Sequence, residues 1–177
     1  MKNVLVFASG SGSNFQAIVE YFKGKDVEFE LLTDKENCYA IERAKNLGVK
    51  HYFVPFKQTE EFLKSKAKYD LYVLAGYMRV LPPKVLENRM FVNIHPSLLP
   101  KFKGLDAIGQ AYRAGESECG ISVHYVNEEV DSGQIIEQRA TKILPGMSLD
   151  ELETAVHKIE HEIYPKVLER ILIGVSC

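Results

Sequence analysis

Short apolar runs alternate with amphipathic segments along the first half of the chain. The apolar runs are mostly continuous, which is typical of strands buried on both faces of a parallel sheet. The segments between them space their apolar residues as a helix does, and several end at a glycine. The pattern therefore predicts βαβ units in a doubly wound α/β fold. The predicted strands occupy residues 3–8, 27–34, 51–56, 70–77 and 91–96, and the predicted helices occupy residues 13–24, 40–49 and 60–67.

The pattern changes after residue 96. A loop rich in Pro, Lys and Gly leads to a short helix at 107–115. Two strands, 120–126 and 134–144, then follow each other with only a loop between them, which favours antiparallel pairing. The segment SLDE at 148–151 matches a capping box and predicts the start of a long helix. The expected fold is a mostly parallel, Rossmann-like sheet with an antiparallel strand pair at its far end and a long C-terminal helix, in a single domain spanning 1–177.

Composition narrows the functional classes. The chain has 177 residues, of which 46% are hydrophobic and 26% charged, with a net charge of −2. No concentrated basic field suggests nucleic acid or a membrane surface as a partner. The three cysteines are scattered without a CxxC pair, so neither a disulfide framework nor a thiolate zinc site is predicted. The N-terminal apolar run is shorter than a signal peptide requires, and the expected location is the cytoplasm.

The first chemistry-bearing stretch is ASGSGSN at residues 8–14, between the first predicted strand and helix. Glycines allow a backbone to approach an anion closely, and a helix N-terminus presents free N–H groups. The spacing is not a complete dinucleotide motif, because Phe15 stands where the third glycine belongs, and Asp34 is only a weak candidate for the acidic residue that follows the second strand. Phosphate binding and a plain serine-capped turn both remain open from this pattern.

The second stretch ends the fifth strand. Asn93 and His95 are two residues apart and therefore project from the same face. An imidazole can transfer protons near neutral pH, and a carboxamide can donate to a developing oxyanion. Downstream, the HYVNEEVDSGQII segment carries Asp131. Its carboxylate is either a partner for His95 or, with Glu128 and Glu129, part of a solvated turn. His124, at the start of the same segment, is either a second site residue or a core histidine.

The third stretch, HKIEH at 157–161, matches a zinc-peptidase signature. The two histidines share one helix face, but the pattern offers no obvious third ligand. A polar stripe containing Glu160, which lines a substrate pocket, explains the residues equally well.

Taken together, the motifs VLVFASGSGSN, LAGYMRVLPP, NIHPSLLPKFKG, GISVHYVNEEVDSG and EHEIYP resemble the folate-dependent formyltransferases, and among them the glycinamide ribonucleotide formyltransferase family. The resemblance covers nearly the whole chain. It implies formyl transfer from 10-formyltetrahydrofolate to the amine of glycinamide ribonucleotide in purine biosynthesis, without a metal. It also implies site residues: a catalytic trio of Asn93, His95 and Asp131, a phosphate loop of Gly12, Ser13 and Asn14, an amine contact at Glu160, and a folate pocket that includes Met78, Arg79, Val80 and Leu81.

The resemblance further implies that Asn93 and a protonated His95 stabilise the oxyanion, while Asp131 keeps the imidazolium populated. The two ligands are the expected partners, with the chain a monomer or a homodimer. The sequence departs from the family pattern at four positions. These departures bear on substrate binding and not on the reaction type. These positions are Lys103, Asp106, Ile108 and Gln134.

Three other functions are alternatives to this interpretation of the sequence. A formyltransferase acting on methionyl-tRNA is expected to carry a further C-terminal domain, and a formyltetrahydrofolate hydrolase an N-terminal regulatory one. A non-catalytic nucleotide-binding module would keep residues 8–14 but would not need Asn93, His95 and Asp131 together.

Overall fold

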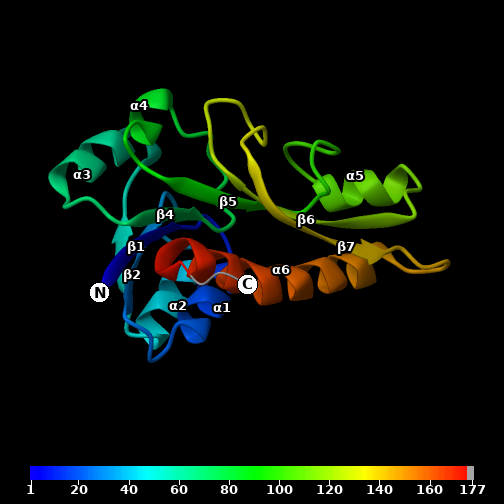
Figure 1. Ribbon diagram of the computed structural model, residues 1–177, viewed down its shortest axis with the longest axis horizontal. Coiled ribbons are helices and arrows are strands. Elements are labelled where there is room, and N and C mark those ends of the chain that lie inside the picture. Colours follow the sequence, from blue (N-terminus) through cyan, green and yellow to red (C-terminus); the bar gives the residue numbers. More distant parts are fainter. Residues whose placement is uncertain (175–177) are drawn as a thin grey trace.

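A computed structural model describes residues 1–174, in which seven strands form one sheet of order β3-β2-β1-β4-β5-β6-β7 (Figure 1). The first five strands along the chain run parallel, and β6 is antiparallel to both β5 and β7. The predicted fold class is therefore confirmed. The strands are β1 (Lys2–Phe7), β2 (Val27–Thr33), β3 (Lys50–Phe53), β4 (Leu71–Leu74), β5 (Phe91–His95), β6 (Glu118–Tyr125) and β7 (Ile135–Lys142).

Helices cover both faces of this sheet. The short helix α4 and the 3-10 turn η1 were not predicted, because four and three residues are too few to show a period. The helices are α1 (Ser13–Tyr21), α2 (Tyr39–Asn46), α3 (Thr59–Ser65), α4 (Pro83–Leu86), α5 (Ala107–Arg113) and α6 (Leu149–Ile173), with η1 at Phe56–Gln58.

Alternate residues of β1 supply two separate cores, as expected for a strand buried on both faces. Val4 and Val6 pack in the core that contains residues of α1, α2, α5 and α6. Leu5 and Phe7 pack in a second core with residues of α3 and α4. The sheet is thus enclosed between two helical layers at its parallel end.

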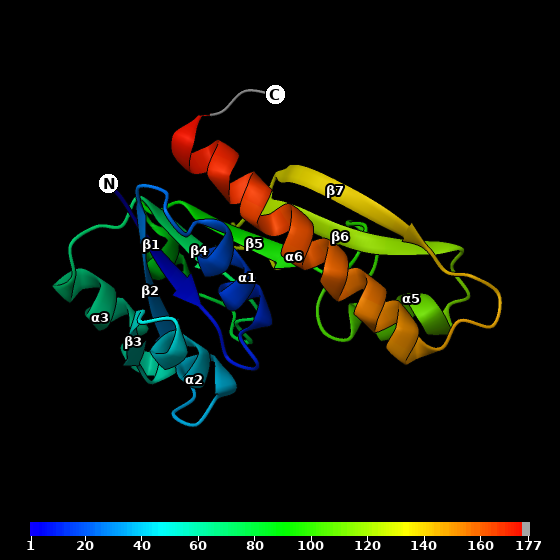
Figure 2. The same ribbon diagram turned by 90° about the horizontal axis from the view of Figure 1, so that it is seen from below.

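Helix α6 runs obliquely from the α5 end of the molecule toward the N-terminus (Figure 2). Its first turn is the predicted capping box, in which Ser148 and Glu151 satisfy each other's backbone N–H groups. Farther along, the fully buried Tyr164 hydroxyl lies 2.9 Å from the Leu74 carbonyl and 3.0 Å from the Val92 carbonyl. Helix α6 is therefore fixed to the sheet at the end of β4 and near the start of β5.

The carboxyl ends of β1, β4 and β5 are neighbours in the sheet, and the loops that follow them leave from the same edge. Ligands of open α/β sheets bind at such an edge. The functional residues predicted from the sequence lie in these loops, in the β6–β7 loop and on α6.

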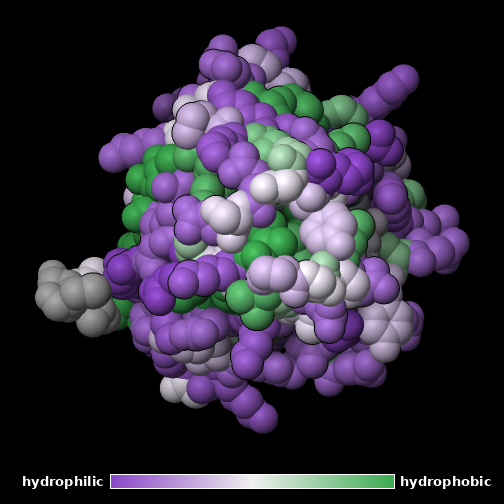
Figure 3. All heavy atoms as spheres, turned by 90° about the vertical axis from the view of Figure 1, so that its right-hand side faces the viewer, coloured by the Kyte–Doolittle hydropathy of each residue, from purple (hydrophilic) through white to green (hydrophobic). Residues whose placement is uncertain are grey.

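Figure 3 shows the face beyond α5 as mostly polar, with hydrophobic residues near its centre and along its left and upper margins. Leu105, in the loop before α5, and Leu144, between β7 and α6, are 71% and 56% exposed. Among residues 1–174, no helix combines the length and the apolarity that a membrane span requires.

Candidate active site

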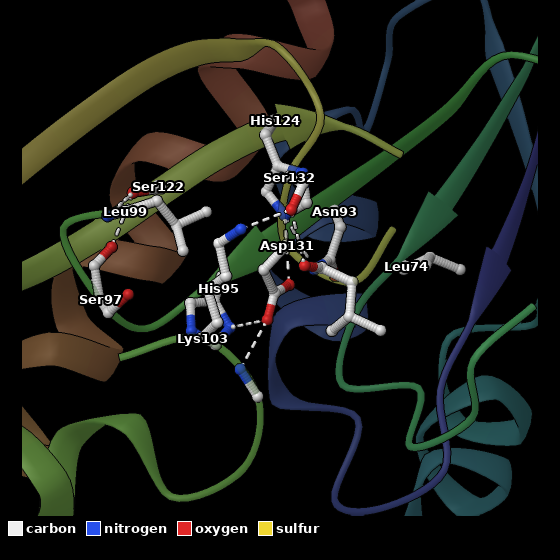
Figure 4. A network of polar contacts seen from close by, with 12 residues as sticks. Leu74, Asn93, His95, Ser97, Leu99, Lys103, Ser122, His124, Asp131 and Ser132 are labelled. Carbon is white, nitrogen blue, oxygen red and sulfur yellow. Dashed lines mark hydrogen bonds and ion pairs between the residues drawn. The ribbon is translucent and has the colours of Figure 1, made fainter. Parts of the chain in front are cut away.

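Asn93, His95 and Asp131 come together at the end of β5, although Asp131 follows His95 by more than thirty residues (Figure 4). Strand β6 runs antiparallel to β5 and ends at Tyr125, opposite Val92, so the β6–β7 loop begins beside β5. The β6–β7 loop then directs the Asp131 carboxylate at the imidazole, with His95 Nδ1 3.4 Å from Asp131 Oδ2. Both side chains are largely buried, at 6% and 9% exposure. Their electrostatic interaction is therefore poorly screened by water.

The orientation of His95 is set by a backbone carbonyl. His95 Nε2 lies 2.8 Å from the Phe102 oxygen, which can only accept, so Nε2 carries a proton. Phe102 has a φ of 54°, and its loop is fixed by a hydrogen bond of 3.0 Å from the Leu99 N–H to the buried Ser122 hydroxyl. With Nε2 occupied, Nδ1 is the ring nitrogen that faces Asp131. Both ring nitrogens therefore face acceptor oxygens.

Asp131 lies in a backbone conformation that is uncommon for a side-chain-bearing residue, with a φ of 50°. Its Oδ2 accepts the Gly104 N–H at 2.8 Å. Burial raises the pKa of the Asp131 carboxyl, but the nearby His124 and His95 imidazoles and the hydrogen bond from the Gly104 N–H outweigh it, so the pKa is lowered. Asp131 is therefore a carboxylate at neutral pH.

His124, whose role the sequence left open, belongs to the site. It is 2% exposed and stands directly opposite Asn93 in the β5–β6 register. Its Nδ1 donates to the Tyr125 carbonyl at 2.9 Å, which leaves Nε2 facing Asn93 Nδ2 at 3.2 Å and Asp131 Oδ1 at 3.6 Å. The signal in the sequence was its place on a strand that pairs with β5, but only a known register identifies its partner.

The loop before α1 follows β1, which is separated from β5 only by β4, and it leaves from the same edge of the sheet. Gly12 is the N-cap of α1 with a φ of 71°, and a Cβ there would lie 2.7 Å from Ala40 Cβ, so only glycine fits. Arg43 Nε donates to the Ser11 carbonyl at 2.7 Å and holds the loop from α2. The serine cap considered from the sequence is not formed, and the first-turn N–H groups of Ser13 and Asn14 lack helical partners.

Glu160 of α6 reaches this loop. Its carboxylate, 4% exposed, accepts from Asn14 Nδ2 at 3.1 Å and from His157 Nδ1 at 2.8 Å. The other Asn14 side-chain atom, Oδ1, is buried without a hydrogen-bond partner. Within residues 1–174, no three His, Cys, Asp or Glu side chains are grouped as a metal would require, so the HKIEH helix offers no metal centre there.

Comparison with known proteins decides the family. Residues 2–168 match the formyl transferase family. A phosphoribosylglycinamide formyltransferase of Bacillus subtilis is 40% identical, over 97% of this chain and 95% of the relative. A crystal structure of glycinamide ribonucleotide transformylase 1 from Geobacillus kaustophilus is 46% identical, covers 97% of this chain and 99% of that chain, and has a TM-score of 0.89. The chain belongs to the formyl transferase family. Within it, the chain is similar to the phosphoribosylglycinamide formyltransferases.

This membership confirms the predicted class, a folate-dependent formyltransferase of purine synthesis. A trifunctional purine biosynthetic protein of Drosophila melanogaster is also 39% identical over 99% of this chain, which spans 14% of that protein. The roles of individual residues in this formyl transferase chain stay predictions.

The predicted folate segment follows β4 and is largely open. Met78 and Val80 are 57% and 63% exposed, whereas Leu81 is buried. Arg79 is directed back toward the protein, where its Nε donates to Asp34 Oδ2 at 2.6 Å. The Asp34 carboxylate is thereby occupied, which removes it as the ribose ligand of a dinucleotide site.

The four departures from the family pattern have structural partners. Lys103 Nζ lies 2.5 Å from the Ser132 hydroxyl and joins the loop after β5 to the β6–β7 loop. Asp106 accepts from Arg113 of α5 at 2.5 Å, and Ile108 is 7% exposed in the larger core. The Gln134 carbonyl accepts the Tyr125 N–H at 2.9 Å.

Proposed function

We propose that this chain transfers the formyl group of 10-formyltetrahydrofolate to the amine of glycinamide ribonucleotide, acting as one domain over residues 1–177. The observation that carries the proposal is the meeting of Asn93, His95 and Asp131 at the end of β5, on the sheet edge from which the loop before α1 (residues 8–12, here called the anion loop) also leaves. A binding module would need the loop but not the trio.

The ribonucleotide binds along α1 and α6. The free N–H groups at Ser13 and Asn14, with the close backbone at Gly12, receive the phosphate. Glu160 accepts a hydrogen bond from the substrate amine and holds its nitrogen toward the formyl carbon. The unpartnered Asn14 Oδ1 supports this assignment, because a buried acceptor is stable only when a donor reaches it.

The folate binds against the segment Met78, Arg79, Val80 and Leu81, whose backbone carbonyls and remaining N–H groups read the edge of the pterin. This places the formyl carbon between the amine and the trio. Such positioning turns a bimolecular step into an effectively unimolecular one.

In the reaction, the amine nitrogen bonds to the formyl carbon, and the carbonyl electrons move to the oxygen. Asn93 Nδ2 and the proton on His95 Nδ1 stabilise this oxyanion. The bond from carbon to N10 of the folate then breaks. The amine nitrogen loses one proton and N10 gains one, and we assign this relay to Asp131 and His95.

The proposal also covers the setting of the reaction. The chain works in the cytoplasm as a monomer or a homodimer, with small molecules and neither nucleic acid nor membrane as partners. Light scattering of the purified protein separates the two assembly states.

The decisive experiment incubates the protein with 10-formyltetrahydrofolate and follows release of tetrahydrofolate with and without glycinamide ribonucleotide. The expected result is release only in the presence of the ribonucleotide, with formylglycinamide ribonucleotide as the product. Release without the ribonucleotide identifies a hydrolase, and no release under either condition favours a binding module.

A further inference from the structure

A second buried carboxylate lies outside the catalytic trio. Asp34 directly follows β2, and its side chain is 1% exposed. Ser9 Oγ donates to Oδ1 at 2.6 Å, and Arg79 Nε donates to Oδ2 at 2.6 Å. A carboxylate buried this deeply is costly unless it is paired and hydrogen-bonded. The proposed reaction does not use it.

The Ser9 hydroxyl joins two ligand-binding segments. It gives its proton to Asp34, so its oxygen is free to accept, and the Met78 N–H donates to it at 3.1 Å. The Ser9 N–H also donates to the Gly76 carbonyl at 3.1 Å. Ser9 opens the anion loop and Met78 opens the folate segment. One buried hydroxyl therefore fixes these two segments relative to each other.

Arg79 provides a second connection to the folate segment. Its guanidinium carbon lies 5.7 Å from the centre of the Phe56 ring, a distance at which a cation is attracted to the ring. Burial raises the pKa of Asp34, but the hydrogen bonds from Ser9 and Arg79 outweigh it and the pKa is lowered. The carboxylate is therefore charged at neutral pH and holds both partners.

We propose that Asp34 is a positioning residue that couples the anion loop to the folate segment, so that the ribonucleotide and the folate each strengthen binding of the other. A phosphate on the loop restrains Ser9, and through Ser9 and Asp34 it restrains Met78 and Arg79. The folate then has less disorder to remove when it binds. Thermodynamic linkage makes the effect equal in both directions. This inference rests on the proposed function.

The test uses Ser9→Ala, which removes the shared hydroxyl, and Asp34→Asn, which keeps the side-chain size but removes the charge that Arg79 meets. Calorimetry measures tetrahydrofolate binding with and without saturating glycinamide ribonucleotide. We expect the ribonucleotide to tighten folate binding to the unaltered protein by a factor of about 5 to 150, the usual range of coupling. In both variants this factor should fall to about one.

Hydrogen exchange supplies a readout independent of turnover. Amides of residues 76–81 should exchange more slowly when the ribonucleotide is added to the unaltered protein, but not when it is added to the variants. If Asp34→Asn fails to fold, Ser9→Ala alone decides the question.

Glu169→Gln is the matched control. Glu169 is a carboxylate on α6 that accepts from Tyr21 and, at 2.6 Å, from Lys25. Its loss should lower thermal stability and leave the coupling factor unchanged. Full coupling in Ser9→Ala, or no coupling in the unaltered protein, overturns the inference. Failure of the unaltered protein to bind either ligand overturns the proposed function instead.

Discussion

At the scale of single residues, the site depends on which ring nitrogen of His95 already has a hydrogen-bond partner within the protein. The Phe102 carbonyl accepts a hydrogen bond from His95 Nε2, so only Nδ1 is available to the reacting oxygen. Its distance of 3.4 Å from Asp131 is longer than most charged hydrogen bonds. The carboxylate thus faces Nδ1 while leaving room for a substrate oxygen to approach the same ring nitrogen.

Replacement of Asp131 by alanine removes the charge that faces His95 Nδ1 and the Gly104 N–H. We expect kcat to fall by about 10²- to 10⁴-fold, the usual contribution of an acid–base group. Steady-state kinetics measure the loss, and circular dichroism should show an unchanged fold. Glu129→Gln, at a 78% exposed side chain in the same loop, is the control and should keep its activity. Equal turnover in both variants would exclude Asp131 from the chemistry.

His157 provides a pH dependence of stability. Its hydrogen bond to the Glu160 carboxylate raises the pKa of His157 above the ordinary value of 6.5, against the opposing effect of burial. When the pKa of a histidine is higher in the folded than in the unfolded state, its protonation stabilises the fold. This stabilisation is complete below the unfolded-state pKa and is lost as the pH rises through the folded-state pKa. His157→Gln should therefore cost more unfolding free energy at pH 5.5 than at pH 8.5.

Urea unfolding at the two pH values measures this difference. His51→Gln is the control, because the His51 ring lies 3.4 Å from the Val49 carbonyl and pairs with no carboxylate among residues 1–174. A stability loss in His157→Gln that is the same at both pH values would show that the contact with Glu160 carries no proton linkage.

At the scale of elements, the β6–β7 loop owes its shape to Gly133 as much as to Asp131. A Cβ on Gly133 would lie 1.6 Å from the Tyr125 carbonyl oxygen, so the two backbones could not approach as they do. Gly133→Ala should push the loop outward, cost about 1–3 kcal/mol as other overpacked sites do, and lower kcat more than it raises KM. Val130→Ala, at a 44% exposed residue of the same loop, should change neither. Unaltered kinetics in Gly133→Ala would mean that the loop tolerates displacement.

The elements differ in how well the sequence predicts them. Continuous apolar runs identified the parallel strands, and the capping box at Ser148 identified the start of α6, because both signals are local. Asn93 and His95 were found because a strand places alternate residues on one face. The contacts of Asp34 and His124 were not predicted, since their partners lie on other strands and depend on strand order and register. Resemblance to a family supplied the role of Asp131, which composition alone would assign to a solvated turn.

At the scale of the whole molecule, the site is assembled from separate layers that must keep their relative positions. The trio belongs to the sheet and its loops, whereas Glu160 belongs to α6, which packs across one helical face. Tyr164 lies four residues after Glu160, which is about one helical turn. Its hydroxyl is the buried polar contact that joins α6 to the carbonyls of Leu74 and Val92. The position of the amine-binding carboxylate thus depends on this contact with the sheet.

Tyr164→Phe removes only that hydroxyl and leaves two buried carbonyls without it. We expect a loss of about 1–3 kcal/mol in unfolding free energy, the cost of unsatisfied buried polar groups. Because Glu160 would be less firmly placed, KM for the ribonucleotide should rise while KM for the folate stays constant. Urea unfolding and steady-state kinetics measure the two effects. Tyr112→Phe is the control: its hydroxyl donates to the Met147 carbonyl at 2.8 Å, away from β4 and β5, so it should cost some stability and leave both KM values unchanged. A rise in both KM values, or in neither, would show that the position of Glu160 does not depend on the Tyr164 contact between α6 and the sheet.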